Sequence, residues 1–354
     1  MTKETFRHEM LNRLKTQRLP HPLMEQTDLV KFVFQGMLGV GHLLSDRERV
    51  TARIEQETEG LFGDPDEPLF EVLSPAWCRI NLRRAIAEQI PPCVIAGLML
   101  ASHTAEQFSR KDVYDFCTDP DAFGGKAVTD TDLLNSIPDE TWLPSHSALY
   151  RQQYHPAYRV VSTEWIPCME IVRKIAGKQA ITKRPLITID GPCASGKTTL
   201  ALKLSEVFEA AVIHTDDFVV PHERKTADRL AIPGGNCDAE RLCKEVVVPW
   251  KRDQTVKYRK YDCGLRRLLP ERTLPECKML IIEGSYCNLP SIREYADLRL
   301  FVDTPENIRM ERLQKRESPE SLKRFRQVWI PLENAYFDAY RLPDESCLVF
   351  HSAI

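Results

Sequence analysis

One glycine-rich stretch, "GPCASGKTT" at residues 191–199, constrains the fold of this chain more than any other segment. The apolar run "LITID" precedes it, and the helical pattern "TTLALKLSEVF" continues from it. Gly191, Gly196, Lys197 and Thr198 meet the G-x-x-x-x-G-K-[ST] pattern in the strand–loop–helix context that a phosphate-binding loop requires. The stretch therefore predicts a phosphate site at the start of a helix.

Each residue type in this loop has a physical reason to be there. Glycines let backbone N–H groups turn inward around phosphates, and the helix N-terminus adds the positive end of its dipole. Lys197 is expected to reach the β- and γ-phosphates, and the Thr198 hydroxyl to bind Mg²⁺. We therefore expect ATP and Mg²⁺ as cofactors. The expected nucleotide contacts are Gly191, Ala194, Ser195, Gly196, Lys197, Thr198 and Thr199.

The second half of the chain reads as an α/β domain. Four short apolar runs, "PLITID", "AAVIHTDD", "KMLIIEG" and "LRLFVDT", are each followed by a helical or loop segment. Buried parallel strands have this character, and their alternation with helices indicates a sheet with right-handed crossovers. We expect a domain at 185–354 with a mostly parallel sheet flanked by helices.

The first half reads differently. Residues 1–155 predict a mainly α-helical domain of unknown role, and residues 156–184 a connecting segment with an extended piece followed by a helix. "CRINLRRAIAEQI" is interpreted as a helix that stops at Pro91 and Pro92, where the next helix begins.

Composition limits the classes of function. The formal net charge of -3 provides no large basic field for nucleic acid. The 11 cysteines show no zinc-type spacing and are typical of reduced thiols, so we expect a cytoplasmic protein. We expect no membrane association, because no apolar run approaches the roughly 20 residues that span a bilayer. A homo-oligomer is compatible with the sequence.

Carboxylates and arginines follow the predicted strands. Asp216 and Asp217 end "AAVIHTDD", and Glu283 ends "KMLIIEG", at the strand edge where α/β sheets bind ligands. Such carboxylates accept a proton from an attacking hydroxyl, hold Mg²⁺, or merely cap the next segment. Arg309, Arg312 and Arg316 share one face of a predicted helix, which either closes over ATP or remains a solvated surface.

Residues 184–345 resemble the uridine kinase and phosphoribulokinase group of P-loop kinases. The resemblance rests on motifs in the same order: "IDGPCASGKTT", "HTDDF", "PGGNCD", "YRKYDC", "IIEGSYCNL", "LFVDTPENIRMERLQKR" and "FRQVWIPLENAYF". It implies a P-loop kinase fold and transfer of the ATP γ-phosphoryl group to a hydroxyl of a small molecule, which is a nucleoside, a sugar or a related metabolite.

The resemblance also implies residue roles. Asp216 matches the family's catalytic aspartate, with Lys197 and the lid arginines Arg309 and Arg312 stabilising charge. Thr198, Asp216 and Glu283 match the Mg²⁺ neighbourhood. The implied substrate contacts are Asp216, Phe218, Asp238, Tyr261 and Arg266, with Asp238 on ribose hydroxyls.

The chain departs from uridine kinases where they recognise the base. Val219 stands where they have an aromatic residue, and "CGLRRL" lacks their histidine-rich loop. The phosphoryl-transfer residues are unaffected, so the acceptor stays open, and Arg266 and Arg267 favour an anionic one.

Other interpretations remain. The chain could be a nucleotide-dependent binding or regulatory protein in which ATP hydrolysis drives the helical half. Arginines and tyrosines at 146–159 and 257–267 could also stack on RNA bases, although the net charge argues against nucleic acid. In the first half, His42, Arg79 and His146 either converge on an anionic ligand or belong to ordinary helix packing.

Overall fold

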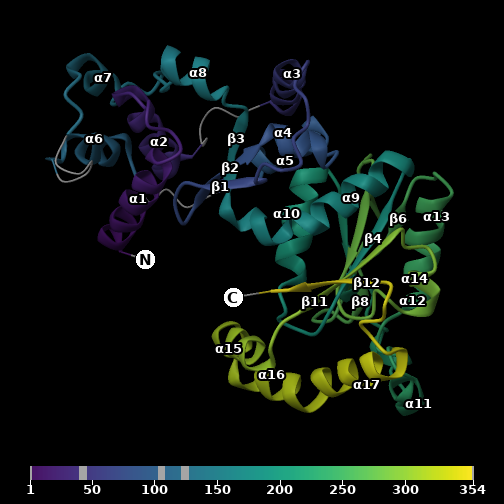
Figure 1. Cartoon of the computed structure of the whole chain (residues 1–354). Coiled ribbons are helices and arrows are strands. Elements are labelled where there is room, and N and C mark those ends of the chain that lie inside the picture. Colours follow the sequence, from purple (N-terminus) through teal and green to yellow (C-terminus); the bar gives the residue numbers. More distant parts are fainter. Residues whose placement is uncertain (1, 40–45, 103–107, 121–126, 353–354) are drawn as a thin grey trace. The chain divides into compact units, whose positions relative to one another are not determined.

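The structure is a computed structural model that describes residues 2–39, 46–102, 108–120 and 127–352. The chain divides into two compact units, residues 1–169 and residues 170–354 (Figure 1). Each unit has its own hydrophobic core, so each is considered separately. No helix within the described ranges is long and apolar enough to cross a membrane.

The N-terminal unit combines helices with a small antiparallel sheet in the order β1-β2-β3. Its core is formed mainly by apolar side chains of α1, α2 and α6. The described elements are α1 (Lys3–Arg18), α2 (Gln26–Leu38), α3 (Arg47–Thr58), β1 (Phe70–Val72), β2 (Trp77–Asn81), α4 (Leu82–Ala87), α5 (Pro92–Leu100), α6 (Arg110–Thr118), α7 (Thr131–Ser136), α8 (Ala148–Tyr154) and β3 (Tyr158–Ser162).

The sheet corrects one sequence prediction. The stretch expected to be helical from Cys78 is strand β2 up to Asn81, and the helix begins only at Leu82. The Asn81 side chain accepts hydrogen bonds from the N–H groups of Arg83 and Arg84, so this residue ends the strand and caps the helix. Pairing with β1 and β3 overrides the local helical pattern.

Two glycines of the N-terminal unit are explained by close packing. A Cβ on Gly36, inside α2, would overlap the Met10 side chain of α1. Gly39 ends α2 with φ of +63°, and a Cβ there would overlap the Trp77 ring. Gly36 and Gly39 therefore serve packing. His42 lies outside the described residues.

The C-terminal unit has the predicted α/β fold. Its main sheet is parallel, with the order β12-β11-β4-β10-β5, and Figure 1 shows α10 on one side and α12 to α14 on the other. The described elements are α9 (Met169–Ile181), β4 (Leu186–Asp190), α10 (Lys197–Phe208), β5 (Ala211–His214), α11 (Ala227–Ala231), α12 (Ala239–Leu242), α13 (Val248–Lys251), β6 (Lys257–Tyr258), β7 (Tyr261–Asp262), β8 (Arg267–Leu268), β9 (Arg272–Thr273), β10 (Leu280–Glu283), α14 (Pro290–Arg293), β11 (Leu298–Asp303), α15 (Glu306–Arg316), α16 (Pro319–Arg324), α17 (Ile330–Tyr340) and β12 (Cys347–His351).

The four apolar runs of the sequence form β4, β5, β10 and β11, and β12 completes the sheet. The expected connecting segment 156–184 contributes β3 to the first unit and most of α9 to the second. Because β4, β5 and β10 are parallel neighbours, the residues that follow them meet at one edge of the sheet.

Candidate active site

The loop between β4 and α10 has the backbone shape of a phosphate cradle. Gly191 has φ of +141° and Gly196 φ of +102°, and Ala194 between them also has a positive φ. A side chain on Gly191 would collide with the carbonyl oxygen of Val302 in β11. The first turn of the 12-residue helix α10 follows at once, so its unpaired N–H groups face the loop.

Lys197 is the first residue of α10 and is buried, with 8% of its surface exposed. Its ammonium donates hydrogen bonds to the carbonyl oxygens of Gly191 and Pro192 at 2.7 and 2.8 Å. The side chain therefore folds back over the loop and holds its positive charge inside the cradle. This loop fits the phosphates of a nucleotide.

A carboxylate and a hydroxyl lie beside the cradle. The Thr198 hydroxyl donates to Glu283 Oε1 at 3.0 Å, and His214 Nδ1 lies 2.5 Å from the same oxygen. The hydrogen bond to Glu283 raises the pKa of His214. These oxygen ligands are of the type that Mg²⁺ binds in phosphoryl-transfer sites. His214 was not among the predicted site residues.

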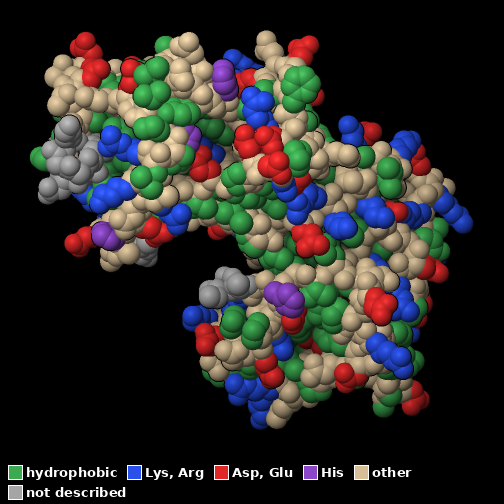
Figure 2. All heavy atoms as spheres, viewed as in Figure 1, with side chains coloured by type: hydrophobic (Ala, Val, Ile, Leu, Met, Phe, Trp, Pro, Cys, Tyr) green, Lys and Arg blue, Asp and Glu red, His purple; other side chains and the backbone are tan. Residues whose placement is uncertain are grey.

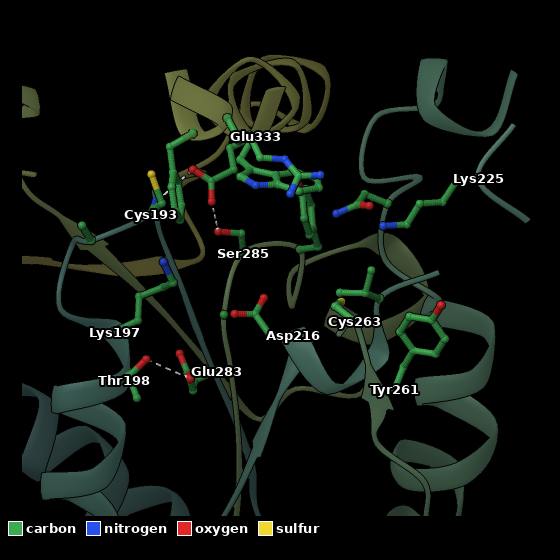
Figure 3. A pocket seen from close by; sticks show the side chains of 18 of the residues that line it. Cys193, Lys197, Thr198, Asp216, Lys225, Tyr261, Cys263, Glu283, Ser285 and Glu333 are labelled. Atoms are coloured by element: carbon green, nitrogen blue, oxygen red, sulfur yellow. Dashed lines mark hydrogen bonds between the residues drawn. The ribbon is translucent and has the colours of Figure 1, made fainter. Parts of the chain in front are cut away.

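Asp216 lies in the short 3-10 helix Thr215–Phe218 that follows β5. Figure 3 shows it facing the same space as Lys197, Thr198 and Glu283. Its side chain is exposed to solvent in the cleft, but the surrounding protein partly desolvates it, and this raises the pKa of the carboxyl group. A carboxylate that holds a proton more strongly than usual is a better general base.

These residues line one cleft of about 490 Å³ in the C-terminal unit. Of the predicted site residues, the cleft brings together Ala194, Lys197, Thr198, Asp216, Tyr261, Arg266 and Glu283. Away from the loop, the lining also carries positive charge. The cationic lining residues there are Lys225, Arg266, Arg316 and Arg324.

Two predicted substrate residues lie elsewhere. Phe218 is fully buried in the hydrophobic core. Asp238 is 1% exposed, caps α12, and accepts a hydrogen bond from Arg224 at 2.9 Å. Neither residue lines the cleft, and their contact with a substrate stays a prediction.

The two predicted lid arginines hold the phosphate loop from outside. Arg309 Nη1 donates to the Cys193 carbonyl oxygen at 3.4 Å, and Arg312 Nη1 donates to those of Ala194 and Ser195 at 3.1 and 3.2 Å. On the same helix, Arg316 lines the cleft. A catalytic role for Arg309 and Arg312 stays a prediction.

Glu333 of α17 is a cleft residue to which sequence reasoning assigned no role. Its Oε2 accepts a hydrogen bond from the Cys193 backbone N–H at 2.9 Å, and its Oε1 accepts one from the Ser285 hydroxyl at 2.6 Å (Figure 3). It therefore ties α17 to the phosphate loop. A single glutamate on a helix gives no sequence signal, because its contacts come from segments far away in the chain.

Tyr336, one turn after Glu333, carries the first stability prediction. Its hydroxyl donates to Asp190 Oδ2 at 2.7 Å, where both side chains are fully buried, and burial raises the pKa of Asp190 to about 6. Tyr336→Phe leaves this carboxyl group without one of its donors. We expect the free energy of unfolding of the C-terminal unit to fall by about 1–3 kcal/mol in chemical denaturation. Tyr340→Phe, in the same helix, is the matched control, and an equal loss there would contradict the assignment.

The N-terminal unit contains a separate buried polar network. His146 lies with its Nδ1 2.8 Å from Asp28 Oδ1 and its Nε2 2.5 Å from the Tyr158 hydroxyl. Burial lowers the pKa of His146 to about 3, and the nearby charges of Lys31 and Arg79 act in the same direction. Arg79 and His146 thus lie in one neighbourhood, where His146 is a neutral imidazole, and an anionic ligand between them stays one of the two interpretations.

This network predicts a pH dependence of stability. The unfolded chain protonates His146 near its ordinary pKa of 6.5, whereas the folded chain does so only near 3. The contribution of His146 to the free energy of unfolding is therefore fully present above pH 6.5. It is lost as the pH falls below this value, and the loss reaches about 2 kcal/mol at about pH 5. The lowered pKa of Asp28 adds to the loss only below its ordinary value of 3.8.

Hydrogen exchange of the slowest β2 amides measures this effect. His146→Gln should flatten the slope between pH 7 and about 5. His155→Asn should keep it, because His155 is exposed and asparagine tolerates its left-handed backbone. A wild-type stability that does not change over this range would contradict the prediction.

The C-terminal unit is similar to known proteins. Residues 186–321 match the model of the Phosphoribulokinase / Uridine kinase family. No curated protein matches the chain at a significant level. Similar solved structures include a possible uridine kinase from Bacillus stearothermophilus, with 22% identity over 51% of this chain and 100% of that chain and a TM-score of 0.38. Another, provisionally described as a fructose transport system kinase from Silicibacter sp. TM1040, has 23% identity over 52% and 98% of the two chains and a TM-score of 0.41.

Proposed function

We propose that the C-terminal unit, whose residues 186–321 match the Phosphoribulokinase / Uridine kinase family, transfers the γ-phosphoryl group of ATP to a hydroxyl of a small molecule. One observation carries the proposal. The Asp216 carboxyl group faces the same cleft as Lys197 and the Thr198–Glu283 pair, so a base and a phosphate site share one space.

Each of these residues has a separate role in an in-line phosphoryl transfer. The N–H groups of the loop and the Lys197 ammonium bind the phosphates, and Thr198 and Glu283 are the groups that would hold Mg²⁺. ATP supplies the phosphoryl group, with ADP as the leaving group. Asp216 takes the proton from the acceptor hydroxyl as its oxygen bonds to phosphorus. Catalysis comes mostly from positioning and charge neutralisation.

The cleft favours an acceptor that carries negative charge. His222, Lys225 and Arg266 line it beyond Asp216, and Tyr261 fixes this side by accepting a hydrogen bond from the His222 N–H at 3.0 Å. A guanidinium and an ammonium bind a phosphate or carboxylate better than an uncharged hydroxyl group. A sugar phosphate or a hydroxy acid fits these groups.

The test is turnover of ATP with Mg²⁺ and paired acceptors. Each uncharged compound is compared with its phosphorylated or carboxylated counterpart, for example ribose with ribose 5-phosphate, and product formation is followed by mass spectrometry. If no acceptor increases ATP consumption and Asp216→Asn leaves basal hydrolysis intact, the kinase proposal is wrong, and the alternative of a nucleotide-dependent binding or regulatory protein is favoured.

The cationic side also predicts a specificity change. Arg266→Ala or Lys225→Ala should raise the KM for the best anionic acceptor about tenfold while the KM for ATP changes little. Arg272→Ala, an exposed arginine of β9 outside the cleft, is the matched control. Unchanged acceptor KM values in both variants would refute an anionic acceptor.

RNA is the weaker alternative. On the described residues of the face in Figure 2, basic and acidic side chains are interspersed over both units. RNA binding would need a basic field and would weaken steeply with salt. A labelled oligonucleotide that fails to bind at low salt removes this alternative.

A further inference from the structure

A second cavity, of about 380 Å³, lies in the N-terminal unit. Its floor is one face of the small sheet, formed by Glu71 of β1, Arg79 and Asn81 of β2, and Tyr158 of β3. The register pairs Glu71 with Arg79 and Asn81 with Tyr158, so the four side chains leave the sheet on the same side. The volume is within the range of small-molecule sites.

Arg79 is fixed at the base of this cavity although it is only 2% exposed. Its Nε and Nη2 donate to Gln35 Oε1 at 3.1 and 2.8 Å, and its Nη1 donates to Glu71 at 3.3 Å. The guanidinium also lies 4.2 Å from the centroid of the Tyr158 ring. Burying a guanidinium costs several kcal/mol before pairing, and apolar packing would avoid that cost. Glu71 pairs with this charge, so Arg79 borders the cavity as a rigid, charge-compensated group.

The Tyr158 hydroxyl is oriented in the same way. It donates to His146 Nε2 at 2.5 Å, while His146 Nδ1–H donates to Asp28 Oδ1 at 2.8 Å. Asp28 is fully buried and is itself held by the Ser147 hydroxyl at 2.7 Å. The Tyr158 hydroxyl is thus held in one orientation by His146 and Gln35. Groups oriented by a second layer of contacts are characteristic of binding sites.

The lining decides the class of ligand. Two carboxylates, Glu67 and Glu71, balance two guanidinium groups, Arg79 and Arg83. The anionic ligand, one of the two interpretations of the basic residues, is therefore not favoured. Five lining residues carry aromatic rings, namely His21, Tyr150, Tyr154, His155 and Tyr158, and the others are Gln17, Pro68, Asn81, Pro156 and Ala157. His21 and Tyr150 stack with their centroids 5.4 Å apart.

We propose that this cavity binds an uncharged ring compound rich in hydroxyl groups, either a nucleoside or a monosaccharide. Carboxylate, amide and guanidinium groups offer paired donors and acceptors to neighbouring hydroxyls. Aromatic rings pack against the flat face of a base or against the C–H face of a sugar. The site is separate from the kinase cleft, because every residue lining it lies in the N-terminal unit.

Hydrogen exchange with mass spectrometry on the full chain tests the proposal. The probes are uridine, adenosine, ribose and glucose, with UMP and ribose 5-phosphate as charged counterparts. We expect at least one uncharged probe to protect residues 70–81 and 150–158. Protection by the nucleosides but not by the free sugars identifies a nucleoside site, and protection by the free sugars but not by the nucleosides identifies a monosaccharide site. Protection confined to the C-terminal unit reports the kinase cleft alone and overturns this proposal, but leaves the proposed kinase activity intact.

Variants give the second measurement. Tyr158→Phe and Glu71→Gln should each weaken binding of the protecting probe about tenfold in calorimetric titrations. Tyr114→Phe, in the same unit but outside the cavity, should leave it unchanged. The titrations are made at a temperature well below the Tm of each variant, so that all proteins compared are folded. Binding unaffected by either variant, tighter binding of the charged counterparts, or no binding of any probe at millimolar concentration would overturn the proposal.

Discussion

Lys197→Met should abolish most phosphoryl transfer, with kcat lower by about a hundred- to a thousandfold. The side chain is buried, and its ammonium supplies the positive charge inside the phosphate loop, bonded to the carbonyl oxygens of Gly191 and Pro192. Methionine has a similar length and no charge, so the loop should keep its shape while losing its main electrostatic contact.

Steady-state kinetics with the best acceptor measure this loss, and fluorescence titration with a nucleotide analogue measures binding. Lys203→Met, in the same helix but outside the cleft, is the matched control. If Lys197→Met keeps more than about a tenth of the wild-type kcat, the loop is not the catalytic phosphate site.

Asp216→Asn should lower kcat by about a hundred- to ten-thousandfold, because the amide cannot accept the proton of the acceptor hydroxyl. Nucleotide affinity should change little, since the loop and Lys197 remain. Product formation under saturating ATP and acceptor is the readout, together with nucleotide Kd.

The neighbouring carboxylate provides the contrast. Asp217 forms an ion pair with Lys260 at 2.7 Å and does not line the cleft. Asp217→Asn should therefore keep kcat within about threefold of wild type, at some cost in stability. A large loss of kcat in Asp217→Asn together with a nearly unchanged kcat in Asp216→Asn would identify Asp217 as the general base.

The α/β half could be predicted because its signals are local. The buried parallel strands β4 and β10 are mainly apolar runs, and Gly191, Gly196, Lys197 and Thr198 all lie within residues 191–198. Glu283 is the last residue of β10 and Asp216 comes shortly after β5, so their convergence follows from the parallel pairing of these strands.

The remainder depends on distant contacts. Strand β2 reads locally as a helix, and only its partners β1 and β3 make it a strand. Glu333 owes its position to Cys193 and Ser285, which lie 140 and 48 residues away. Asp238 lies in the expected motif, yet its carboxylate is hydrogen-bonded to Arg224 and caps the start of α12. These outcomes depend on which distant residues contact a side chain in the folded protein, and the local sequence does not contain that information.

The bonds made by α17 have a consequence for how the chain matures during synthesis. Glu333 and Tyr336 complete the hydrogen bonding of Cys193 and Asp190, residues made about 140 positions earlier. A nascent chain that lacks α17 therefore contains the phosphate loop without two of its buried hydrogen-bond partners. The loop should reach its final conformation only after α17 has been made and has packed against it.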